Sequence, residues 1–162
     1  VVFPDGSAVQ VEPASEFEVR LLDFSRGTQR DRSFMVRAGS IVARVSKAFG
    51  AQSQATICTP TAVAAARGTG FRVLYDPAKK QTFVGVVDGT VEFKTSLGQM
   101  QLPTGSLVAA QGYQAGGPQA LTAAQNSRIG TSFQQMGQFE KEPGFLQNLE
   151  YALNTALDPF LQ

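Results

Sequence analysis

The sequence contains no histidine and no tryptophan, and it has a single cysteine, Cys58, among its 162 residues. Without histidine, the chain lacks the commonest general base and transition-metal ligand, and the Cys58 thiol has no imidazole to activate it. One cysteine also excludes a disulfide within the chain. These absences argue against an enzyme, and we expect no catalytic residue, no metal site and no cofactor.

The sequence also lacks a charge excess and a long apolar run. Its 14 basic and 13 acidic residues give a net charge of +1, too little to attract nucleic acid. No segment approaches the roughly 20 apolar residues that cross a bilayer, and no signal peptide is visible. Because the chain opens on Val1 rather than on methionine, we expect it to be a segment of a longer precursor. Residues 23–32 are polar and predict a solvated loop.

A short pattern of glycine, then serine or threonine, then apolar residues recurs along the chain. The copies are Gly6-Ser7, Gly39-Ser40, Gly89-Thr90 and Gly105-Ser106, with a looser copy at Gly68-Thr69. Each copy predicts a tight turn that leads into a strand, because glycine adopts backbone angles that other residues resist.

Alternating apolar and polar residues predict many short strands between Val1 and about Tyr113. Phe17, Val19 and Leu21, for example, alternate with charged residues and are expected to face a core. Two hairpins are predicted, one joining residues 71–75 to 82–87 and one joining 90–95 to 99–102. The pattern predicts an all-β fold, either a double-sheet sandwich of jelly-roll type or a β-helical wrap.

The composition changes after about Gly116, so we predict a β domain over residues 1–115 and a partly helical extension over 116–162. Residues 119–141 have weak helical character, whereas apolar residues spaced three and four apart over 145–157 predict an amphipathic helix. Its stripe includes Phe145, Leu149 and Leu153. We expect this candidate partner surface to pack on the β domain, on a partner or on a neighbouring segment.

The alanine-rich stretch around residues 62–66 is the most unusual part of the predicted β domain. Its side chains are too small to fill a sheet interface, and Phe71 and Phe83 are candidate fillers. Arg67 lies in phase with Val63, which predicts either a buried guanidinium that binds loop carbonyls or a carboxylate, or a contact to a ligand or partner. The G-x-G at Gly68 lacks the third glycine and the following helix of a phosphate site.

Two stretches of the sequence resemble FecR domains. They run from Thr59 to Val73, which includes Arg67-Gly68-Thr69-Gly70-Phe71, and from Thr82 to Phe93, which includes Asp88-Gly89-Thr90-Val91. The resemblance extends over roughly residues 1–112. The signature positions, which the resemblance marks as structural, are Thr59, Val63, Arg67, Gly68, Thr69, Phe71 and Gly89.

The resemblance implies a non-catalytic, all-β domain of bacterial extracytoplasmic proteins. In the best-known members this domain is the periplasmic part of an anti-sigma regulator and receives a signal from an outer-membrane receptor. This chain shows no sigma-binding region and no membrane span. From the resemblance we expect a signalling module that is periplasmic or otherwise extracytoplasmic and whose partner is a protein, either a receptor signalling domain or an envelope protein. The alternatives are a cell-envelope structural or glycan-associated module and, third, an enzyme.

Overall fold

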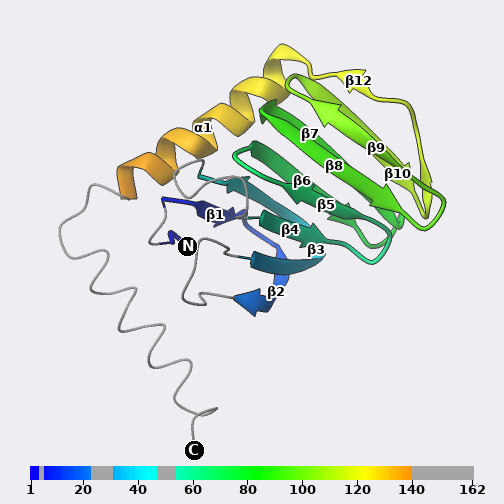
Figure 1. The fold of residues 1–162 in the computed structure, drawn as a ribbon, viewed down its shortest axis with the longest axis horizontal. Coiled ribbons are helices and arrows are strands. Elements are labelled where there is room, and N and C mark those ends of the chain that lie inside the picture. Colours follow the sequence, from blue (N-terminus) through cyan, green and yellow to red (C-terminus); the bar gives the residue numbers. More distant parts are fainter. Residues whose placement is uncertain (4–5, 23–30, 47–53, 140–162) are drawn as a thin grey trace, which may run out of the picture.

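The computed structural model describes residues 1–3, 6–22, 31–46 and 54–139, which contain twelve strands and one helix (Figure 1). The strands are β1 (Ala8–Val11), β2 (Glu16–Leu22), β3 (Asp31–Arg44), β4 (Gln54–Cys58), β5 (Val63–Ala66), β6 (Gly70–Asp76), β7 (Gln81–Asp88), β8 (Thr90–Thr95), β9 (Gly98–Pro103), β10 (Ser106–Gln111), β11 (Gln114–Ala115) and β12 (Gln119–Ala120). The helix, α1, is Ala123–Phe139. The predicted class, all-β with a helical extension, is confirmed, as are both hairpins.

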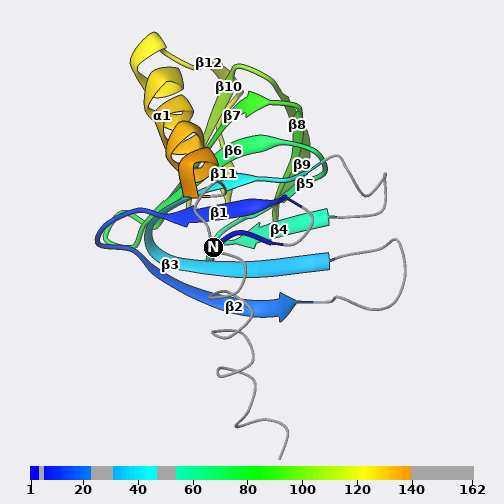
Figure 2. The ribbon, with the colours of Figure 1, turned by 90° about the vertical axis from the view of Figure 1, so that its left-hand side faces the viewer.

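The long strand β3 connects two layers of one continuous sheet. Its first part, up to Ala38, pairs with β2 and, in parallel, with β4. Its second part, from Gly39 onward, pairs with β1 and β6. We call the layer of β1, β6, β7, β10, β11 and β12 sheet A, and the layer of β2, β4, β5, β8 and β9 sheet B. The two layers face each other, with β3 in both (Figure 2). The predicted double sheet is thus confirmed.

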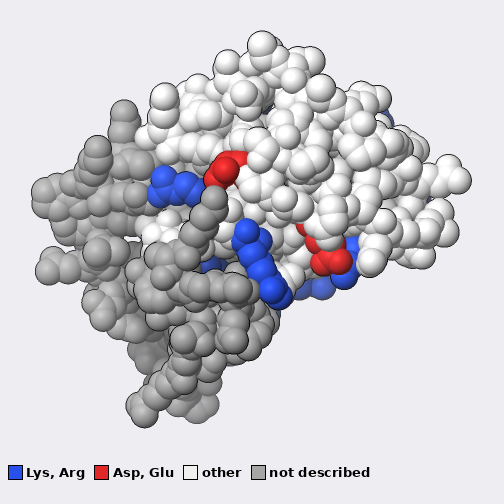
Figure 3. All heavy atoms as spheres, turned by 45° about the horizontal axis from the view of Figure 1, so that its top comes forward, with Lys and Arg blue, Asp and Glu red and all other residues white. Residues whose placement is uncertain are grey.

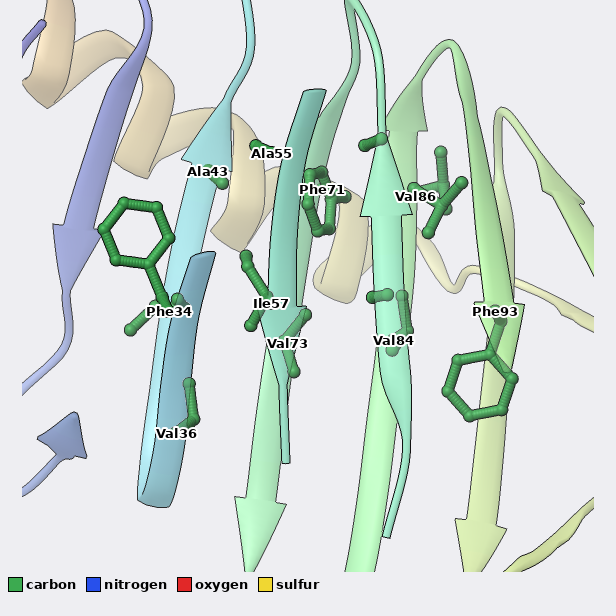
Figure 4. Packing of buried hydrophobic residues seen from close by; sticks show 14 of the residues in the cluster. Phe34, Val36, Ala43, Ala55, Ile57, Phe71, Val73, Val84, Val86 and Phe93 are labelled. Carbon is green, nitrogen blue, oxygen red and sulfur yellow. The ribbon is translucent and has the colours of Figure 1, made fainter. Parts of the chain in front are cut away.

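The hydrophobic core fills the space between the two sheets (Figure 4). Alternate residues of each strand point into it, as period-two patterning requires. The fully buried large side chains include Phe34, Val36, Ile57, Phe71, Val73, Val84, Val86 and Phe93. Phe71 belongs to the same core cluster as the alanines of β5, so it is a filler as predicted. Phe83 is not, because it lines a groove under α1, outside the sandwich.

The repeated glycine pattern marks the points where the chain passes from one sheet to the other. Gly68, Gly89 and Gly105 separate β5 from β6, β7 from β8 and β9 from β10. All three have a left-handed φ, of +59°, +82° and +80°, so the predicted backbone angles are confirmed. Gly39, with a φ of +79°, is not a turn between strands but lies inside β3 where the strand changes sheets. A Cβ there would lie 2.3 Å from the Ser15 hydroxyl, so only glycine fits.

Helix α1 covers part of the outer face of sheet A (Figure 2). Ile129 and Met136 are buried against Val42 of β3 and residues near the N-terminus. The Phe133 ring lies over Gly70, where an added Cβ would approach it to 2.8 Å. Over the described residues, no helix is long and apolar enough to cross a membrane. The structure thus places a helix in the segment predicted to be only weakly helical, whereas the predicted helix over 145–157 lies outside the described residues.

Candidate functional site

The signature residues Gly68, Thr69 and Gly89 form two corners that lie against each other. The Thr69 hydroxyl lies 3.0 Å from the carbonyl oxygen of Arg67 and 3.0 Å from that of Thr90, and shares its single proton between them. It therefore connects the corner between β5 and β6 to the corner between β7 and β8. A third corner joins the row, because the Thr104 hydroxyl donates to the Gly89 carbonyl at 3.0 Å. The hydroxyl residues next to the corner glycines thus hold adjacent corners together.

Thr59, the first signature residue, belongs to a buried group of three threonines. The hydroxyls of Thr59 and Thr61 each lie 2.8 Å from the Thr82 hydroxyl. Thr59 also accepts a hydrogen bond from the Ala62 amide at 3.0 Å. This network satisfies the polar groups of the turn before β5 and ties it to β7 of sheet A. The contacts of Thr59, like those of Thr69, lie within the scaffold.

Two arginines lie where the sequence did not predict them. Arg67 is exposed rather than buried, and its guanidinium donates to the Gln54 side chain at 3.3 Å. Arg32, expected in a solvated loop, is in β3 and is 2 % exposed. Its guanidinium carbon lies 4.5 Å from the centre of the Phe3 ring, a cation–π contact. The alternation rule failed for Arg67 because β5 ends at Ala66, before the arginine.

A groove of about 390 Å³ lies between α1 and sheet A. Its apolar lining comes from both sides: Leu74, Phe83, Leu107, Leu121 and Ile129. Arg72 and Arg128 also line it, and the lining contains no acidic residue. Among the described residues, the face drawn in Figure 3 carries only a few basic and acidic side chains.

A charge cluster lies next to this groove. Glu12 accepts hydrogen bonds from the Ser40 hydroxyl and from two nitrogens of Arg72, the Nε at 3.2 Å, and Arg128 lies 3.9 Å away. Burial raises the pKa of Glu12, but the hydrogen bonds from Ser40 and Arg72 and the charges of Arg72 and Arg128 outweigh it and lower the pKa below its usual value. Glu12 is therefore ionised at neutral pH and is unsuited to general acid catalysis.

Strand β2 is an outer strand of sheet B. Among the described residues it pairs only with β3, so no described strand binds the backbone amides and carbonyls on its other side. Val19 was expected to face the core, yet 46 % of it is exposed, because no strand covers it at this edge. The side chain of Leu21 lies outside the described part. Glu18 of β2 pairs with Arg37 of β3 at 2.8 Å on the surface.

Sequence reasoning missed the groove and the charge cluster. A usable signal exists in β6 and β7, which carry apolar residues on both faces, for example Val73 and Leu74. Strands of this kind are covered on both sides. Residues 1–3, 6–22, 31–46 and 54–139 contain no group of three cysteine, aspartate or glutamate side chains placed to hold a metal.

By its fold, the protein is a β-sandwich with one outer helix, and glycine corners mark where the chain passes from one sheet to the other. The sequence model of the family described as "FecR protein" matches residues 1–92, which is more than half of the chain. The chain therefore belongs to the FecR family. The resemblance to FecR domains that the sequence showed is thereby confirmed. No curated protein matches the sequence.

The fold is similar to that of two crystal structures, at 1.65 and 2.50 Å resolution, of a "putative anti-sigma factor" from Parabacteroides distasonis ATCC 8503. The TM-scores are 0.60 and 0.61, each at 18% identity, over 76% of this chain. The chain spans 55% of the length of that protein.

Proposed function

We propose that this chain is a non-catalytic protein-interaction module of an extracytoplasmic signalling pathway. Membership of the FecR family over residues 1–92 carries the proposal. The similarity in fold to a protein described as an anti-sigma factor agrees with it. We infer a periplasmic location from the family, together with a partner that is either a receptor signalling domain or another envelope protein.

The chemistry of the described residues supports binding rather than catalysis. The conspicuous charge cluster is internally paired, with Glu12 held ionised by Arg72, and it has no histidine to exchange protons with. The signature residues Thr59 and Thr69 make their hydrogen bonds within the scaffold. Their roles are therefore to hold the sandwich in shape, and the surface is left for recognition.

The edge of β2 is the surface best suited to a protein partner. An incoming strand would pair with its open backbone groups, which provides affinity, while exposed side chains such as Val19 provide selectivity. The other outer strand of sheet B, β9, lies close to β10 and β7, so its edge is less open. Charged residues at Glu18 and Arg20 discourage unspecific pairing at β2. Phe145, Leu149 and Leu153 remain a second proposed contact surface.

The proposal is tested by photo-cross-linking in the cells that produce the protein. A photoreactive phenylalanine analogue replaces Val19 on β2 in one variant. In the matched control it replaces Lys79, at the exposed tip of the hairpin between β6 and β7. We expect a discrete protein adduct from the Val19 variant only, and we expect protease added to spheroplasts to degrade the chain.

Other outcomes contradict the proposal. Equal adducts from both positions, or none from either, would argue against β2 as the contact edge. Protection from external protease would overturn the extracytoplasmic location. Sedimentation with purified peptidoglycan without any protein adduct would favour the cell-envelope alternative.

A further inference from the structure

The outer face of sheet A is only partly covered by α1. The covered part contains Val42, Gly70 and Gly85, on which the apolar side chains of the helix rest. Further along the same strands, Leu74 of β6 is the register partner of Phe83 of β7, which is the partner of Ala109 of β10. All three are half-buried and face away from the core. They form an apolar row across three strands beside the helix.

The width of this row is close to the diameter of a helix. Neighbouring strands lie about 4.8 Å apart, so three strands span about 10 Å, which is close to the diameter of a helix with its side chains. The groove of about 390 Å³ lies between this row and α1. Apolar residues on both faces of a sheet are typical of strands with a layer on each side. The row is therefore suited to an amphipathic helix lying alongside α1.

We propose that residues 145–157 of this chain fill the groove as a helix antiparallel to α1. The chain itself argues for this occupant. Their apolar stripe has helical spacing, and α1 ends at Phe139, so residues 140–144, which include Pro143-Gly144, would serve as the connection. Connections of about two to eight residues between helices are typical of antiparallel neighbours. Thirteen residues would span about 20 Å, compared with about 25 Å for α1.

The charges of the two surfaces are complementary. Residues 140–162 contain four acidic residues and one lysine, a net charge of −3. Of the two arginines that line the groove, Arg72 is paired with Glu12, whereas Arg128 lies 3.9 Å from that carboxylate and 67% of its side chain is exposed. An acidic amphipathic segment thus matches the apolar floor of the groove and the exposed Arg128 at its rim.

A segment packed in this way would also affect partner binding, and this consequence rests on the proposed function. If the stripe of Phe145, Leu149 and Leu153 packs on sheet A alongside α1, a partner that binds these residues must first displace the segment. The stripe would then be a contact surface that is buried until a partner displaces it, rather than one that is permanently exposed. The packing itself is tested without any partner, so its failure and the failure of the proposed function are distinguishable.

The test is intramolecular cross-linking in the full chain carrying Cys58→Ser. One variant adds Gln125→Cys and Ala156→Cys, which an antiparallel helix with its turn near residue 141 would place opposite each other. The matched control adds Gln125→Cys and Leu146→Cys, about 15 Å further along the helix axis. With a short bis-maleimide at low protein concentration, we expect the first pair to cross-link roughly ten-fold faster, because packing raises its effective concentration.

Two further substitutions in the first pair test whether the faster cross-linking depends on the groove. Phe83→Asp puts a charge on the apolar row and should reduce the rate of the first pair to that of the control. Leu97→Asp, at the exposed turn between β8 and β9 of sheet B, should leave it unchanged, and circular dichroism verifies that both variants fold. Equal rates for the two pairs, a faster control pair, no effect of Phe83→Asp, or adducts only between two molecules would each overturn the proposal.

Discussion

Replacing Gly89 by alanine tests whether the corners hold the two sheets together. An alanine at a φ of +82° costs about 1–2 kcal/mol in backbone strain. Its Cβ would also lie 2.8 Å from the Thr69 hydroxyl and 3.0 Å from the Gly68 carbonyl oxygen, so the neighbouring corner must shift. Weakening the shared Thr69 hydrogen bond, which leaves buried carbonyls less well satisfied, adds about 1–2 kcal/mol. We therefore expect Gly89→Ala to lower the free energy of unfolding by about 2–4 kcal/mol.

Two other glycines separate these contributions. Gly105 has nearly the same φ, +80°, but open space where its Cβ would lie, so Gly105→Ala should cost only the strain of about 1–2 kcal/mol. Gly98 has open space and no left-handed φ, so Gly98→Ala should cost nothing or stabilise slightly. Urea denaturation gives the free energy of unfolding of each of the three variants. The values are comparable as long as the m-values are equal. Equal losses at Gly89 and Gly105 would refute the contact between corners.

Three further predictions concern the hydrogen bonds, the helix and the charge cluster. Thr69→Val should destabilise by about 1–3 kcal/mol in urea, while Thr69→Ser, which keeps the hydroxyl, should recover most of the loss; equal losses would contradict the bridging role. Phe133→Ala should cost about 3 kcal/mol and speed amide exchange in α1 more than in β6, whereas uniform acceleration would argue against local docking. Because the folded-state pKa of Glu12 is lowered, its contribution is fully present above the usual glutamate range and is lost as pH falls through the folded-state pKa. The stability difference between the parent chain and Glu12→Gln should therefore shrink on acidification in that window, and a difference that grows there would contradict the assigned pairing.

The sequence was sufficient for features that depend on local backbone chemistry. Glycine followed by a hydroxyl residue predicted the corners at Gly68, Gly89 and Gly105, because a left-handed φ is a property of single residues. Alternation predicted both hairpins for the same local reason. What a single repeat does not reveal is that successive corners stack and exchange hydrogen bonds, since that depends on the path of the whole chain.

Features that depend on neighbours distant in sequence were less predictable. Val19 alternates like a core residue, but its exposure depends on β2 lying at an edge. Arg32 looked like part of a polar loop, although contact with Phe3 accounts for its burial in β3. The groove also escaped prediction, because its lining combines β6, β7 and β10 with α1, an element whose own sequence is only weakly amphipathic. Apolar residues on both faces of β7 were the available signal.

Hydrogen exchange of the β2 amides, in the complex captured through Val19, tests the proposed recognition most directly. A partner strand added at this edge would protect every second amide of Glu16–Leu22, those that point away from β3. The account predicts this alternating gain in protection, with little change in β6 or β7. Unchanged exchange throughout β2, with new protection confined to another surface, would contradict it.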